Sequence, residues 1–137
     1  MLPDTIPPDV AAIFNTSPDA VEMLRNVMQR AGIVVVSAFT WEIRDGHVDL
    51  AAFIKQHQPR VIVYDIAPPY DENWNLFLHL RAMPFLAGLE FVITSTNVRY
   101  VQQLARTERI HEIIGKPFDL DEIVRAVKEA LKARPVR

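Results

Sequence analysis

Short apolar runs rich in β-branched residues alternate with longer segments of helical periodicity, and this alternation constrains the fold more than any other feature of the chain. Such runs are typical of strands that are buried on both faces of a sheet. The expected strands are Ala11–Phe14, Ile33–Ser37, Val61–Tyr64, Phe91–Thr94 and Ile110–Ile114. The expected helices are the segment that follows Ser17, then Val48–His57, Glu72–Arg81 and Val98–Arg106, and the segment that follows Asp119.

Strands that alternate one by one with helices predict parallel strands joined by right-handed crossovers, which gives a three-layer, doubly wound α/β sandwich of the (βα)5 type. The 137 residues suffice for one domain and are too few for two good cores. We expect this domain to span residues 11–133. We expect residues 1–10 to form a flexible N-terminal segment and residues 134–137 a C-terminal tail.

Composition excludes several functional classes. The net charge of −2 gives no electrostatic basis for direct binding of nucleic acid or an anionic membrane, and the absence of cysteine excludes disulfides and thiolate chemistry. No run approaches the roughly 20 apolar residues of a membrane span, so we expect a cytoplasmic protein. The four histidines show no ligand spacing. Trp41 and Trp74 are expected to be packing anchors and not residues that stack on a ligand.

The turn after the first expected strand, "FNTSPDAV", contains no glycine, which excludes both a dinucleotide-binding turn and a P-loop. Polar side chains follow the other strands where ligands bind in open parallel sheets. Asp65 follows one strand, Thr94 ends the next, and Lys116 follows the last. A carboxylate can accept a phosphoryl group, while a hydroxyl and an ammonium can hold phosphoryl oxygens. From its own stretch alone, Asp65 is better interpreted as a turn residue that supports the "APPYDENW" loop, and only together with Thr94 and Lys116 does it indicate a functional pocket.

These residues resemble the receiver domain of two-component response regulators. Asp65 to Thr94 is 29 positions and Thr94 to Lys116 is 22; "DIAPP" is similar to the acceptor loop of that family, and "KPFDLDEIVRAVKEAL" to its ending. The resemblance implies a flavodoxin-like strand order 2-1-3-4-5 and a phosphoacceptor at Asp65 that Thr94 and Lys116 assist. It also implies a cis peptide bond before Pro117.

The same resemblance implies partners and a cofactor. The phosphoryl donor would be a histidine kinase or a phosphotransfer protein, and the output would pass to a separate effector protein. The partner surface would lie on the fourth helix, fifth strand and fifth helix of the family, with Tyr100, His111 and Ile113 as contacts, and a homodimer is compatible with it. An Mg²⁺ ion would be held by Asp65, by the backbone of Ala67, and by the two residues after the first strand.

The sequence departs from the family at those last two residues, because Asn15 and Thr16 stand where receivers have two acids. One charge pair at 4 Å is worth roughly 4 kcal/mol at an effective dielectric near 20, so losing two charges weakens Mg²⁺ binding by about a thousandfold or more. A second departure is Ile113, where the family often has an aromatic residue that rotates on phosphorylation.

Two functions therefore stay open. The chain is either an atypical single-domain receiver that is phosphorylated on Asp65, or a pseudo-receiver that acts as a phosphorylation-independent interaction module. In neither case is it an enzyme beyond Mg²⁺-dependent phosphorylation and dephosphorylation of its own Asp65.

Overall fold

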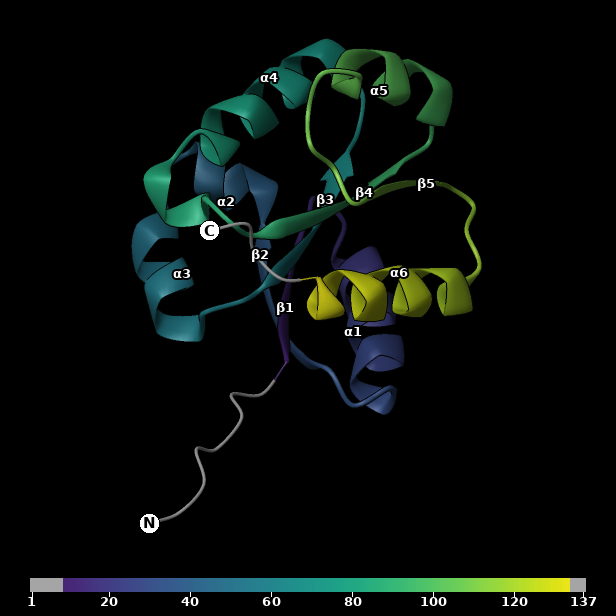
Figure 1. Ribbon diagram of the computed structural model, residues 1–137. Coiled ribbons are helices and arrows are strands. Elements are labelled where there is room, and N and C mark those ends of the chain that lie inside the picture. The colour runs from purple at the N-terminus through teal and green to yellow at the C-terminus, as the bar shows by residue number, and fades with distance from the viewer. Residues whose placement is uncertain (1–8, 134–137) are drawn as a thin grey trace.

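The computed structural model describes residues 9–133 (Figure 1). The segments 1–8 and 134–137, on which most of the expected flexible ends fall, lie outside the described residues. The strands are β1 (Val10–Asn15), β2 (Val34–Phe39), β3 (Val61–Ile66), β4 (Glu90–Ser95) and β5 (Glu112–Gly115). The helices are α1 (Pro18–Arg30), α2 (Thr40–Arg44), α3 (Leu50–His57), α4 (Tyr70–Arg81), α5 (Val98–Ala105) and α6 (Leu120–Lys132), with a 3₁₀ turn η1 (Pro84–Leu86) before β4.

The five strands form one parallel sheet in the order β2-β1-β3-β4-β5, which confirms the expected topology. The order places β1, β3 and β4 in the interior of the sheet and leaves β2 and β5 at its edges. Every residue of β1 and β3 is buried, as expected for strands covered on both faces. Because all strands run the same way, their carboxyl ends meet at one edge, and the candidate residues lie there.

Helices cover both faces of the sheet, as Figure 1 shows, and each face has its own apolar core. One core joins α1 and α6 to the sheet through residues such as Leu24 and Ile123. The other lies beneath α3, α4 and α5 and contains an aromatic cluster in which the Phe77 ring touches the rings of Tyr64, Trp74 and Phe91. Trp74 is buried in this core, which agrees with its expected role as a packing anchor.

Trp41, the other expected packing anchor, is 43% exposed. It belongs to α2, a five-residue helix at the end of edge strand β2 that the periodicity did not reveal because it spans little more than one turn. The Trp41 ring stacks on Phe39 at a centroid distance of 5.9 Å, so its apolar face is covered by a neighbour in sequence and not by the core.

Most element boundaries lie within two residues of the expected ones. β1 begins at Val10, and β5 is displaced toward its carboxyl end. The side chains of Ser17, Asn97 and Asp119 accept backbone hydrogen bonds at the starts of α1, α5 and α6, as their residue types indicate. Within the described chain, none of the helices has the length and apolar character that crossing a membrane requires.

Candidate functional site at the carboxyl edge of the sheet

Asp65 lies one residue before the end of β3, the central strand, and is 6% exposed. It stands directly opposite Thr94 in the β3–β4 register. A buried carboxylate needs hydrogen bonds and a countercharge, because leaving it without either costs several kcal/mol. The hydrogen-bond partners of Asp65 therefore indicate whether its carboxylate belongs to a functional site or only stabilises a turn.

Two side chains from neighbouring strands provide that support. The hydroxyl of Thr94, which is fully buried, donates to Oδ1 of Asp65 at 2.6 Å. Nζ of Lys116 lies 2.6 Å from the same oxygen. Both distances are in the range of charge-assisted contacts. The structure thus brings together the acid, the hydroxyl and the ammonium that the spacing indicated.

Lys116 reaches Asp65 from the turn after β5. Its backbone N–H donates to the carbonyl of Ser95 at 2.8 Å, which ties this turn to the end of β4. The Lys116–Pro117 peptide bond is cis, which confirms the expectation. Just before it, Gly115 packs so closely on α5 that an added Cβ would lie 2.5 Å from Cγ2 of Val98, so a larger residue there would force Val98 to move.

The two oxygens of Asp65 have different surroundings. Oδ1 accepts from Thr94 and faces Lys116, whereas none of the hydrogen bonds in residues 9–133 ends on Oδ2. Within the same residues, the side-chain polar atom that is fully buried without a hydrogen bond belongs to Arg81. Because Oδ2 of Asp65 has no hydrogen bond within these residues and is not such an atom, it keeps contact with solvent. The two carboxylate oxygens of Asp65 are therefore not equivalent.

The neighbouring phenol responds to the same environment. Burial raises the pKa of the Tyr64 hydroxyl far above its ordinary value, and the charge of Asp65 raises it further. Tyr64 thus stays a neutral core residue beside the site.

The residues expected to hold Mg²⁺ do not fit that ion. The Asn15 side chain turns back onto its own loop, where Oδ1 accepts from the Ser17 amide at 3.0 Å, and Thr16 is exposed. The carbonyl of Ala67 accepts from Nδ2 of Asn73 at 2.6 Å. Asp65 is then the one carboxylate of the set, and Lys116 already neutralises it. Magnesium requires near-ideal octahedral oxygen ligands and favours carboxylates, so this donor set is a poor match.

The three expected partner contacts come from α5, from β5 and from the residue before β5, and the structure does not bring them into one contact group. Tyr100 on α5 and His111 just before β5 are partly exposed. Ile113 on β5 is also partly exposed but packs against the core beneath α3, α4 and α5. Its side chain is thereby an extension of that core, as its place in an apolar strand indicates.

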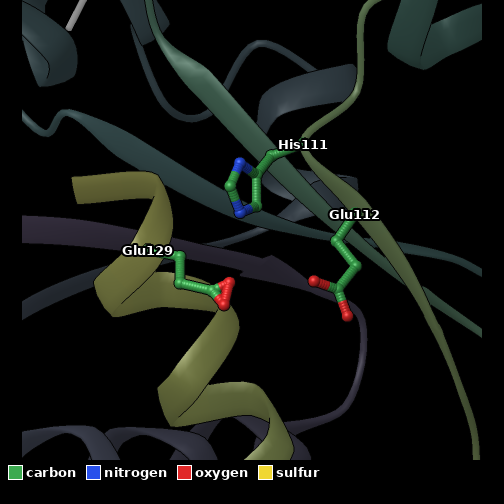
Figure 2. A group of neighbouring side chains, drawn as sticks. All are labelled: His111, Glu112 and Glu129. Atoms are coloured by element: carbon green, nitrogen blue, oxygen red, sulfur yellow. The ribbon is translucent and has the colours of Figure 1, made fainter. Parts of the chain in front are cut away.

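The side chains of His111, Glu112 and Glu129 have ligand atoms within 4.8 Å of one another, between the start of β5 and α6 (Figure 2). The sequence did not reveal this group, because Glu129 comes from α6 and approaches β5 only through packing. Arg125 contacts both carboxylates, at 2.7 Å to Glu112 and 2.9 Å to Glu129. These hydrogen bonds raise the pKa of the Arg125 guanidinium. The two negative charges already have a cationic partner, which disfavours a bound metal.

Comparison with known proteins supports the fold. No family model and no curated protein matches the sequence. Among solved structures, a sensor protein from Polaromonas sp. JS666 superposes with a TM-score of 0.73 at 16% identity, covering 91% of this chain and 97% of its own. A response regulator from Thermotoga maritima gives 0.70 at 18% identity, with 92% and 99% covered.

A CheY-like response regulator receiver domain from Methylobacillus flagellatus gives a TM-score of 0.69 at 17% identity, with 90% of this chain and 98% of that chain covered. At such identities the likeness concerns the fold. It extends over nearly the whole length of both chains, and the strand order is the same as the one observed here. The chain has the CheY-like, flavodoxin-type fold of response regulator receiver domains.

Proposed function

We propose that this protein is a receiver module of two-component signal transduction and that Asp65 is its phosphoacceptor. The observation that carries the proposal is the arrangement of three side chains from β3, β4 and the turn after β5. Thr94 and Lys116 both contact Oδ1 of Asp65, and Oδ2 stays open. In a parallel sheet of this order, the carboxyl edge is where ligands bind.

The chemistry that fits this arrangement is the transfer of one phosphoryl group. Oδ2 of Asp65 forms a bond to phosphorus while the bond between phosphorus and a ring nitrogen of a donor phosphohistidine breaks. The leaving imidazole takes up a proton, and the product is an acyl phosphate on Asp65. Lys116 and the Thr94 hydroxyl then hold the phosphoryl oxygens, because an ammonium and a hydroxyl stabilise the added negative charge.

The proposal makes the chain a signalling acceptor and not an enzyme with a separate substrate. Its partners are a histidine kinase or phosphotransfer protein as donor and a separate effector protein as recipient, in the cytoplasm. The surface formed by α5, β5 and α6 is the candidate recognition face, with Tyr100, His111 and Ile113 as contacts, and it could also join two copies of the chain.

A second candidate function is supported by the poor magnesium site. Asn15 and the Ala67 carbonyl are engaged in hydrogen bonds within the protein, and Asp65 is neutralised by Lys116. Because these groups already have partners within the protein, the pocket supports a phosphorylation-independent interaction module. In such a module the same surface binds its partner without a phosphoryl group.

The experiment that separates the two functions is intact-mass analysis after incubation with a small acyl phosphate or with a phosphorylated histidine kinase. The first function predicts one added phosphoryl group on the wild type and none on Asp65→Asn. If the wild type stays unmodified with both donors, with and without Mg²⁺, the second function replaces the first. Asp65→Asn is a suitable control because it keeps the shape of the side chain and removes its charge.

A further inference from the structure

Two tyrosines join α4 to α5 through a reciprocal pair of hydrogen bonds. Tyr70, the first residue of α4, shares a hydrogen bond of 2.6 Å with Thr96, which lies in the loop before α5. Tyr100, on α5, donates to Oδ1 of Asp71 on α4 at 2.5 Å. The two rings meet edge to face at 6.1 Å. We call these four residues the tyrosine clasp.

The clasp connects the two chain segments that leave the candidate site. α4 follows β3, which carries Asp65, and the loop with Thr96 follows β4, which carries Thr94. A further bond runs between the same segments, since the buried Ser95 hydroxyl donates to the carbonyl of Ile66 at 2.9 Å. A chain of contacts thus runs from the strand ends that carry Asp65 and Thr94 to the surface of α5.

The clasp provides side-chain hydrogen bonds near the site that β5 does not provide. The Ile113 side chain on β5 has no polar group and packs against the core. Tyr70 and Tyr100 each offer an aromatic ring with a hydroxyl, on the two helices next to the site. Both of their hydrogen bonds lie near the surface, where a binding partner can reach them.

We propose that Tyr70 and Tyr100 are positioning residues. The clasp holds the β4–α5 loop so that the Thr94 hydroxyl stays on Asp65, and it couples this contact to the surface of α5. The effect on phosphoryl transfer rests on the proposed function, whereas the coupling itself exists in the unmodified protein. Breaking one hydrogen bond of the clasp is expected to loosen the loop by about two- to tenfold, the range of a single net hydrogen bond.

The first test uses the unphosphorylated protein and nuclear magnetic resonance. The readouts are the Thr94 methyl signal and the hydrogen-exchange protection of the Asn97 amide, which donates to the Ser95 hydroxyl within the loop. Tyr70→Phe and Thr96→Val are expected to shift the Thr94 signal and to lower the protection of Asn97 by about two- to tenfold. Thr96→Ser keeps the hydroxyl and is expected to restore both.

Thr107→Val is the matched control, because Thr107 is exposed and its side chain makes no hydrogen bond within residues 9–133. The proposal is overturned if Tyr70→Phe and Thr96→Val leave Thr94 and Asn97 as they are in Thr107→Val. It is overturned as well if Thr96→Ser behaves like Thr96→Val, since the hydroxyl would then not be the active group.

The second test asks whether the surface of α5 communicates with the site. Tyr100→Phe removes a hydroxyl that touches neither Thr94 nor Asp65, yet it is expected to shift the Thr94 signal in the same direction as Tyr70→Phe. With a small acyl phosphate as donor, the rate of Asp65 modification is expected to change by about two- to tenfold in both variants. Absence of an adduct on the wild type, with this donor and with a phosphorylated histidine kinase, would refute the proposed function and leave the resonance test in force. An unmoved Thr94 signal in Tyr100→Phe would refute the coupling.

Discussion

Replacing Lys116 by methionine should destabilise the protein more than any other single change at the candidate site. The substitution keeps the length of the side chain and leaves the Asp65 carboxylate, which is 3% exposed, without its countercharge. At 2.6 Å and an effective dielectric near 20, the attraction between the two charges is roughly 6 kcal/mol, much of which offsets the cost of burial. Removing one partner of a buried pair usually costs about 3–5 kcal/mol. Since Lys116 is 28% exposed and partly screened, we expect a loss of about 2–4 kcal/mol.

Removing the other charge of the pair, in Asp65→Asn, should lower the free energy of unfolding much less. In Asp65→Asn, the ammonium of Lys116 can turn toward solvent, and the amide still accepts from Thr94, so we expect a loss of about 1 kcal/mol or less. No second acid lies beside Asp65, because Asn15 and Thr16 occupy those positions, so the change relieves no charge repulsion. The double variant should resemble Asp65→Asn, which gives a coupling energy of about 2 kcal/mol or more.

Urea unfolding of the four proteins, followed by circular dichroism and fluorescence, measures these free energies, provided that the two probes give the same transition. The reasoning is wrong if Lys116→Met costs less than about 0.5 kcal/mol, because the carboxylate would then not depend on the lysine. It is also wrong if Asp65→Asn costs more than Lys116→Met, since the order of the two losses follows from which charge is the more buried.

Three further predictions concern the surroundings of the site. Gly115→Ala should lower stability by about 1–3 kcal/mol, because its Cβ would meet Val98 at 2.5 Å, and the additional change Val98→Ala should recover most of the loss in urea unfolding. Asp71→Asn should lower the pKa of Tyr100, which hydrogen bonding to the Asp71 carboxylate raises, and ultraviolet titration against Tyr100→Phe measures the shift; an unchanged titration would contradict the bond. The wild type should gain no thermal stability from millimolar Mg²⁺, whereas Asn15→Asp should gain about 1 kcal/mol once the ion exceeds its dissociation constant several-fold; a wild-type response as large as that of the variant would contradict the poor fit.

The sequence was sufficient for the fold and for the central part of the site. Alternating apolar runs and helices predict the parallel sheet, and a parallel sheet brings the ends of its strands together whatever the details of packing. The convergence of Asp65, Thr94 and Lys116 follows from their places at three strand ends, so it needs only the correct strand order. That order, however, came from the resemblance to receiver domains and not from the periodicity.

The contacts around the site could not be predicted, because they depend on how side chains turn after the backbone is in place. The use of the Ala67 carbonyl by Asn73, the hydrogen bond between Tyr70 and Thr96, and the exposure of Trp41 leave no periodic signal. Each joins residues whose distance in space is set by loop geometry. The substitution of acids by Asn15 and Thr16 was visible in the sequence, but the hydrogen bond of Asn73 to the Ala67 carbonyl was not.

The most direct test of the central claim is to trap the phosphorylated residue. After incubation with a phosphorylated histidine kinase, borohydride converts an acyl phosphate of aspartate into homoserine, which peptide mass spectrometry assigns to one position. The proposed function predicts homoserine at residue 65 in the wild type and at no position in Asp65→Asn. Homoserine at another position, or the same adduct in Asp65→Asn, would show that Asp65 is not the phosphoacceptor.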